Sequence, residues 1–282
     1  MNNVPHDMQQ LFETAMDYVH KGEHYHAVKL FKKIIKKEKE WVAPYFELSK
    51  IYKKHQDWKG TYHYSKKTVS LDSANKEAWW NLGIAATANG RSRIARNIWS
   101  KFGQHPFQER AVCVRLQRDN QFEIIWGLQL DPTRVQIYSI PHPKSDRTYK
   151  DLILIDKHII GHTVVKNKKQ AVFQELDLLK RSVYQTYTCW LYSSKESDIY
   201  ILEKLCQDAG IGFEVWSNAV RLKSLAKADE LPEYFTADML PKDEDAEGVQ
   251  VAFGAKLPNQ IHEVLEQWKV ITLSSCSELI AL

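Results

Sequence analysis

The chain has 282 residues and a mass of 32.9 kDa, which is long enough for two or three compact domains. Hydrophobic residues make up 44% of it and charged residues 26%, so it can bury real cores and wholesale disorder is excluded. No apolar run approaches the length of a membrane span, and the first ten residues resemble no secretion signal. We therefore expect a soluble protein of the cytoplasm.

The net charge of +4 is unevenly distributed. Residues 1–107 contain 18 Lys and Arg against 10 Asp and Glu, giving +8, whereas residues 108–282 contain 21 against 25, giving −4. Within the second part, residues 229–247 hold eight carboxylates and one lysine. This separation predicts an acidic partner for the basic front, or the chain's own acidic segment folding back onto it.

The four cysteines are far apart in the sequence and form no CxxC pair. They are Cys113, Cys189, Cys206 and Cys276. Neither a disulfide framework nor a zinc ribbon is indicated, and we expect reduced, mostly buried thiols.

The first hundred residues contain an internal repeat with a period of 34. At this offset the small residues Ala15, Ser49 and Gly83 coincide, and so do Ala27, Thr61 and Ala95. Small residues at fixed positions suit the close approach of two helices. Each copy therefore predicts a helix, a short turn and a second helix, with turns at residues 21–25, 55–59 and 89–93.

This pattern resembles the tetratricopeptide repeat (TPR) family, whose unit has 34 residues with the same order of large, small and turn positions. The third copy is closest to the family pattern, and the second is degenerate because Gln56 replaces the turn glycine. The resemblance covers roughly the first third of the chain. It implies a superhelix whose inner groove, lined by the first helix of each pair, binds protein segments.

The register of the repeat predicts which residues line that groove. Positions 5, 9 and 12 of each unit share one face of its first helix. The predicted partner-binding residues are Phe12, Met16, Phe46, Lys50, Lys53, Trp80 and Ile84. Such a face suits an acidic protein or peptide with apolar anchors. The alternative stays open that the aromatic rings pack against neighbouring repeats and the lysines are a solvated face.

From residue 108 onward the hydrophobic period changes from helical to alternating. We expect short strands at 111–116, 122–128, 135–140, 152–155 and 159–165, forming a small antiparallel sheet or barrel over residues 108–182. A turn is predicted at 156–158. The loop at 141–151 contains His142, Asp146 and Arg147 and is a candidate recognition loop, or else a solvated connection.

The last hundred residues, 183–282, show a strand–helix–strand pattern twice, around the acidic insertion at 229–247. The expected elements are strands at 184–192, 213–216, 219–222, 249–255 and 270–274, with helices from 196 to 209 and from 258 to 268. This order predicts a ferredoxin-like module. The whole chain is thus expected to contain a TPR helical domain at 8–107, a small β module and a ferredoxin-like α+β module.

No catalytic motif, cofactor motif or metal-ligand spacing is convincing in this sequence. We therefore predict a non-enzymatic adaptor that binds a partner segment in the TPR groove, without a cofactor or a metal. The charge distribution disfavours a nucleic-acid partner. The alternative hypothesis is a small-ligand sensor in which the C-terminal module and its acidic segment control the groove.

Overall fold

A computed structural model describes residues 4–104, 106–118, 121–165, 168–193, 195–216, 223–224, 234–236 and 248–282. The chain divides into two compact units, Met1–Pro106 and Phe107–Leu282, and each is described by itself. Within the described ranges, no helix has both the length and the apolar character needed to cross a membrane.

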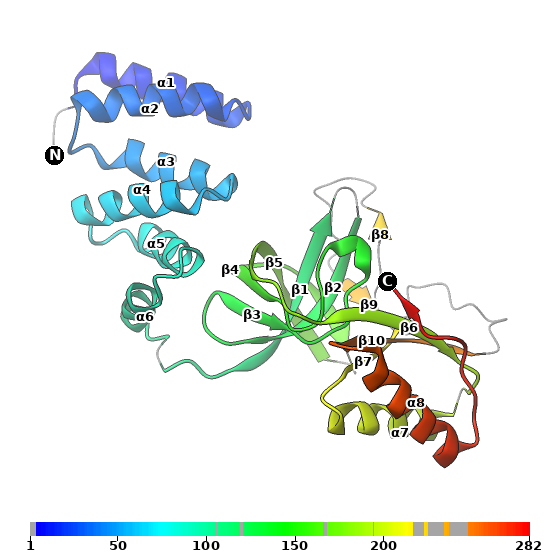
Figure 1. The fold of residues 1–282 in the computed structure, drawn as a ribbon. Helices are drawn as coiled ribbons and strands as arrows, with labels where there is room; N and C mark the ends of the chain where they lie inside the picture. Colours follow the sequence, from blue (N-terminus) through cyan, green and yellow to red (C-terminus); the bar gives the residue numbers. More distant parts are fainter. Residues whose placement is uncertain are drawn as a thin grey trace. The chain divides into compact units, whose positions relative to one another are not determined.

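The first unit is a stack of helix pairs (Figure 1). Its helices are α1 (His6–His20), α2 (His24–Lys37), α3 (Val42–Lys54), α4 (Trp58–Leu71), α5 (Lys76–Ala88) and α6 (Ser92–Lys101). The first helix of each pair ends at residue 20, 54 or 88, so the 34-residue period of the sequence is also the period of the structure. The predicted helical repeats are confirmed.

The turns within the pairs follow the same period. The backbone enters the left-handed region at Gly22 (φ 77°), Gln56 (φ 56°) and Gly90 (φ 69°). Glycine adopts this conformation without the steric penalty that a Cβ atom brings. The second repeat therefore makes the same turn as its neighbours with a residue that is less suited to it.

The small residues of the repeat lie where its helices touch. Ala15 and Ser49 are fully buried in the first helices of their pairs. At the equivalent Gly83, a Cβ atom would lie 2.3 Å from the ring of Trp99 on α6. A larger side chain there would push the two helices apart, which explains why small residues recur at this position.

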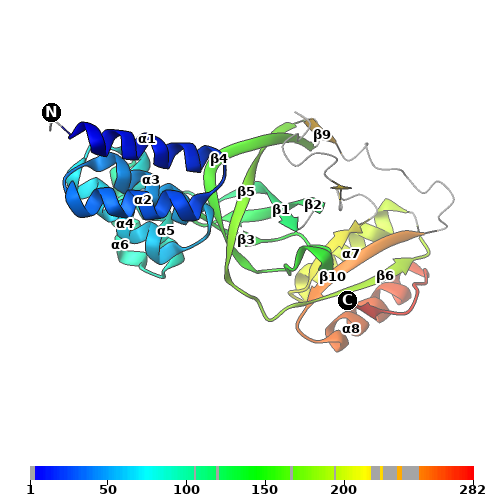
Figure 2. The same cartoon turned by 90° about the horizontal axis from the view of Figure 1, so that it is seen from above.

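The second unit contains two sheets. The larger one consists of β1 (Arg110–Arg118), β2 (Gln121–Gln129), β3 (Arg134–Ile137), β4 (Leu152–Val165), β5 (Lys168–Lys180), β8 (Lys223–Ser224) and β9 (Tyr234–Thr236). Strand β1 pairs with both β2 and β5, so β1 to β5 close into a barrel. Figure 2 shows β4 and β5 as its long, paired strands. Buried aliphatic side chains from β1 to β5 fill the interior.

This barrel differs in three ways from the small antiparallel module predicted. The sheet is mixed, because β1 pairs with β5 in parallel and β4 with β9 in parallel. The expected turn at 156–158 lies inside β4, where register shifts mark a bulge. The partner of β4, β5, was not expected, and β8 and β9 come from beyond residue 182.

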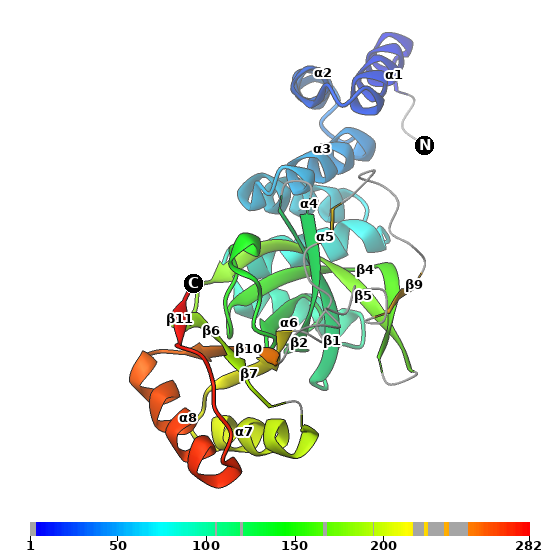
Figure 3. The ribbon, with the colours of Figure 1, turned by 90° about the vertical axis from the view of Figure 1, so that its right-hand side faces the viewer.

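The smaller sheet has the strand order β11-β6-β10-β7, with every pairing antiparallel. Its strands are β6 (Gln185–Leu191), β7 (Gly212–Val215), β10 (Val249–Ala255) and β11 (Ile280–Ala281). Helices α7 (Glu196–Asp208) and α8 (Pro258–Thr272) pack together on one face of it (Figure 3). Fully buried Trp268 is the largest side chain in the core between helices and sheet.

The strand expected at 270–274 is wrong, because α8 continues to Thr272 and ends at Leu273 in the left-handed region. Val270 and Ile271 are exposed on this last turn. Their β-branched composition suggested a strand, but the buried face of α8 is the one that carries Trp268. The strand expected at 219–222 lies outside the described residues, and so does the acidic insertion except for β9.

Candidate functional site

The predicted groove residues lie on the first helices of the repeats with different degrees of exposure. Phe12, Met16 and Phe46 are half-buried, so part of each side chain reaches the surface. Lys50 extends over Phe46, with its Nζ 5.0 Å from the ring centroid and 2.7 Å from the carboxylate of Glu47. These residues offer apolar surface beside both signs of charge.

The third repeat contributes little accessible surface at the predicted positions. Trp80 is 7% exposed, and its ring centroid lies 4.9 Å from that of Trp99 and 5.6 Å from that of Phe102. Ile84 is fully buried. Both side chains therefore belong to the core of the helical unit and pack beneath its surface. This agrees with the alternative that the aromatic rings pack against neighbouring helices.

Lys53 links two repeats. Its Nζ donates a hydrogen bond of 2.9 Å to the side-chain oxygen of Asn81 on α5, and Asn81 is itself buried. A lysine head group with such a partner is held in place, because its stem is half-buried and its charge is hydrogen-bonded. Lys53 therefore has a structural contact with the next repeat in addition to its place in the predicted groove.

A hollow of about 550 Å³ lies at the junction of the first two repeats. It is lined by residues 22–26, Val28, Ile51, Tyr52, His55 and Asp57. Ile51 and His55 follow Phe46 and Lys50 by five residues, which places them about 140° further around α3. The hollow is therefore separate from the predicted groove.

The centre of this hollow is a pair of histidines from successive repeats. Nδ1 of His24 and Nε2 of His55 are 2.7 Å apart, so one ring donates a hydrogen bond and the other accepts it. Burial lowers the pKa of His24, and the neighbouring Lys54 and His55 lower it further. Among the described residues, no three potential ligands gather to hold a metal ion.

The positive charge of the helical unit lies mainly on the second helices of the pairs. Helices α2, α4 and α6 contain no Asp or Glu. Their basic residues are Lys29, Lys32, Lys33, Lys36, Lys37, Lys59, Lys66, Lys67, Arg93, Arg96 and Lys101. All of these except Lys67 are exposed. Much of the basic surface of the helical unit therefore lies outside the predicted groove.

The candidate recognition loop closes one end of the barrel. Its short 3-10 helix (η1, Pro143–Ser145) is anchored by buried Glu123, which accepts hydrogen bonds from the Ser145 hydroxyl (2.5 Å) and the backbone N–H of His142 (3.1 Å). The His142 ring accepts a hydrogen bond from the Lys144 N–H and stacks on Trp216 at 5.6 Å. The Nδ1 atom and the ring face of this histidine thus have partners within the chain.

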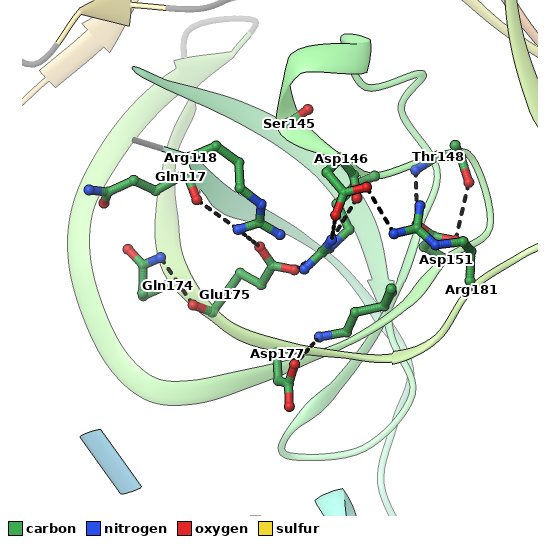
Figure 4. A network of polar contacts seen from close by, with 12 residues as sticks. Gln117, Arg118, Ser145, Asp146, Thr148, Asp151, Gln174, Glu175, Asp177 and Arg181 are labelled. Carbon is green, nitrogen blue, oxygen red and sulfur yellow. Dashed lines mark hydrogen bonds and ion pairs between the residues drawn. The ribbon is translucent and has the colours of Figure 1, made fainter. Parts of the chain in front are cut away.

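Arg147 and Asp146 of the same loop belong to a network of charges. Figure 4 labels Asp146 in this network, together with Arg118, Glu175 and Arg181. Arg147, 6% exposed, donates from Nε to Glu175 at 2.5 Å, and Arg118 approaches the other Glu175 oxygen at 3.4 Å. Asp146 accepts from Arg147 at 3.2 Å and from Arg181 at 2.9 Å. Burial raises the pKa of Glu175, and the two arginines oppose that rise. The loop is therefore fixed by its charged side chains.

The same loop joins the barrel to the smaller sheet. Tyr149 lies against Gly212 and Gly254, where an added Cβ atom would come within 2.8 and 2.5 Å of Ile140 and Tyr149 respectively. Nε1 of Trp216 donates to the carbonyl of Ile140 at 2.9 Å. In the structure, residues 141–151 close one end of the barrel and connect the barrel to the smaller sheet.

Comparisons with known proteins give little direct guidance. No family model matches the chain, and no curated protein matches it. Among solved structures, the crystal structure of MamA protein is similar over 33% of this chain and 51% of its own, with 22% identity and a TM-score of 0.32. The chain thus spans about half the length of that protein.

A second solved structure is the C-terminal TPR-containing domain of a putative FK506-binding protein, PFL2275c, from Plasmodium falciparum. It is similar over 36% of this chain and 78% of its own, with 19% identity and a TM-score of 0.32. Likenesses of this extent carry no function from these proteins to this chain.

Proposed function

We propose that this chain is a non-enzymatic scaffold that binds an extended segment of a partner protein along the first helices of its repeats. The observation that carries the proposal is the part of the half-buried side chains of Phe12, Met16 and Phe46 that reaches the surface, beside the ammonium group of Lys50. The Phe12 ring also packs against Phe31 and Trp41 within the unit. Aromatic anchors combined with a charge suit a segment that has apolar side chains and carboxylates. Trp80 and Ile84 would act by holding this surface in shape.

We also propose three modules, at residues 8–107, 108–182 and 183–282, the last of them ferredoxin-like. Supporting this assignment, the strand order β11-β6-β10-β7 with two helices on one face is the arrangement of a split βαβ motif. This fold hosts many functions, so it adds no activity by itself. The internal partners of His142, Asp146 and Arg147 support a structural part for the loop rather than a catalytic one.

The test is a selection of peptides from a random phage-displayed library on the full-length chain, followed by fluorescence anisotropy with the selected peptides. We expect sequences with carboxylates near aromatic or aliphatic residues. Phe46→Ala and Lys50→Glu should each weaken binding about tenfold or more, because each removes contact or charge from the groove.

Lys36→Glu is the matched control, since it makes the same charge change on the exposed face of α2. It should change affinity less than threefold. If Lys36→Glu weakens binding more than Lys50→Glu does, the peptides occupy the outer basic helices and the groove assignment is wrong. Circular dichroism melts of all variants confirm that the helical unit stays folded.

A further inference from the structure

Three of the four cysteines converge in the core of the C-terminal module. Cys189 lies on β6, Cys206 on α7 and Cys276 in the segment after α8, and all contribute to one hydrophobic cluster. Cys189 and Cys276 are separated by 87 positions in the sequence. Their proximity therefore depends on the pairing of distant parts of the chain.

Backbone pairing sets the position of Cys276. It lies opposite Leu191 in an antiparallel bridge, flanked by hydrogen bonds from Tyr192 N–H to the Ser275 carbonyl (2.9 Å) and from Ser277 N–H to the Trp190 carbonyl (2.8 Å). Side chains two positions apart on a strand share a face. Cys189 consequently lies on the same face as Leu191, diagonally across from Cys276, and both side chains belong to one hydrophobic cluster.

The two thiols have different surroundings. Cys189 is 1% exposed, whereas Cys276 is half-buried and keeps part of its surface in contact with solvent. Interaction with the neighbouring Cys189 thiol lowers the pKa of Cys276 to about 7, and the ammonium of Lys269 adds to that effect against burial and Glu266. The same interaction and burial raise the pKa of Cys189. One accessible thiolate thus lies beside one protected thiol.

Cys206 and Cys113 lack this combination. Burial raises the pKa of each to about 12, and neither is exposed. Thiolate character and access decide which cysteine reacts with an oxidant. Of the four cysteines, Cys276 alone has both.

We propose that Cys276 is an oxidation site for hydroperoxides and that Cys189 is its resolving thiol. The Cys276 thiolate attacks one peroxide oxygen, the O–O bond breaks, and with one proton the products are a sulfenic acid and water or an alcohol. The Cys189 sulfur then displaces the sulfenic hydroxyl, which leaves as water with the Cys189 proton. The net change is two thiols oxidised to one disulfide and one peroxide reduced.

This disulfide has a structural consequence. It joins the segment after α8 to β6 and closes a loop that contains α7, β7, β10 and α8. A cross-link across such a long loop restricts the unfolded chain more than the folded one. The oxidised module should therefore resist urea and proteolysis better than the reduced module.

The experiment treats the reduced full-length chain with hydrogen peroxide and follows intact mass and disulfide-linked peptides. We expect a loss of two hydrogens and a Cys189–Cys276 cross-linked peptide. Cys276→Ser should abolish both. Cys189→Ser should instead leave a sulfenic acid at Cys276 that dimedone labels, since the resolving thiol is missing.

Cys113→Ala and Cys206→Ala are the controls and should form the disulfide at the wild-type rate. A cross-link at another pair would overturn the proposal, as would first oxidation at Cys113 or Cys206, or over-oxidation of wild-type Cys276 without a disulfide. Circular dichroism of each variant checks that the module is folded.

A second readout tests the role of Lys269. Iodoacetamide alkylation of Cys276 should increase with pH through about 7. In Lys269→Gln the rate at neutral pH should fall about three- to tenfold, with equal rates at a pH where the thiol is fully ionised. An unchanged pH profile would remove Lys269 from the proposal, and a midpoint near that of a free thiol in the wild-type chain would overturn it.

Discussion

The helical unit and the β-rich unit obtain their stability from contacts of different range. In the helical unit, a residue contacts partners within its own repeat or the next. Gly83 packs against the ring of Trp99, and Lys53 donates a hydrogen bond to Asn81. In the β-rich unit, β4 pairs with β9 and β6 with β10, across more than 50 residues. The structure of a repeat can therefore be predicted from nearby sequence, whereas the pairing of a sheet strand depends on distant sequence.

The two units also differ in whether their charged side chains are exposed or buried. The helical unit places its lysines mainly on exposed helix faces, where water solvates them. The barrel buries Arg147 and Glu175 at the end that residues 141–151 close. Loss of either partner should therefore cost far more free energy of unfolding than loss of an exposed lysine.

The largest expected effect is that of removing one partner of the buried ion pair. Arg147→Met should destabilise the β-rich unit by about 3 to 5 kcal/mol, because the Glu175 carboxylate keeps its burial and loses its nearest cation. Urea unfolding followed by tryptophan fluorescence measures it. Adding Glu175→Gln should recover part of the loss, and a double variant as unstable as the sum would contradict this reading. Lys53→Met in the helical unit is the comparison and should cost roughly 1 kcal/mol.

The next effect concerns the close approaches at glycine. Gly83→Val and Gly254→Val should each cost about 2 to 3 kcal/mol, since the new Cβ atoms would lie 2.3 Å from Trp99 and 2.5 Å from Tyr149. Hydrogen exchange should locate the first loss within the α5–α6 pair and the second at the joint between barrel and smaller sheet. Protection lost uniformly over the chain in both variants would show that this assignment is wrong.

A smaller effect depends on pH. The Asp198 carboxylate accepts hydrogen bonds from Ser193 (2.6 Å) and Ser274 (3.0 Å), and the Ser193 hydroxyl is the main cause that lowers its pKa. Because the folded pKa lies below the unfolded one, this stabilisation is complete above about pH 4 and is lost as pH falls further. Asp198→Asn should therefore be less stable than wild type at pH 7 and approach it at pH 3 in urea titrations. A difference independent of pH would contradict the argument.

The smallest effect is a gain. Gln56→Gly should stabilise the helical unit by roughly 0.5 to 1 kcal/mol, because residue 56 holds a left-handed conformation at the turn where the other repeats have glycine. Thermal unfolding of the chain measures it. Gly22→Ala and Gly90→Ala are the matched controls and should lose about 1 kcal/mol each. A loss in Gln56→Gly would mean that the side chain contributes more than the strain costs.

Much of the helical unit could be predicted because its evidence is periodic. The spacing of small residues located helix contacts, and the positions of Gly22 and Gly90 located turns that the structure confirms. Burial within the groove was harder to foresee. Trp80 occupies the same register as Phe46, but the neighbouring Trp99 and Phe102 enclose it. Side chains at equivalent positions of the repeats point in the same direction from their helices, but the residues around them can differ.

The β-rich unit shows the opposite balance. Alternating residues indicated most strands, but bulges inside β4 resembled a turn and the apolar last turn of α8 resembled a strand. No local pattern could show that Arg147 would be buried against Glu175, or that Tyr149 would lie on Gly254. The structure shows Asp146 and Arg147 of the candidate recognition loop in ion pairs within the β-rich unit, and recognition by this loop stays a prediction.

By itself, the sequence determined the helical repeat, its turns and the existence of strands and helices after residue 108, since these depend on contacts between near neighbours in the chain. The tertiary structure decided which strands pair, which charges are buried and which cysteines meet. Cys189 and Cys276, 87 positions apart, show why. Their separation carries no periodic signal, and their chemistry depends on the burial and the neighbouring charge that the fold places around them.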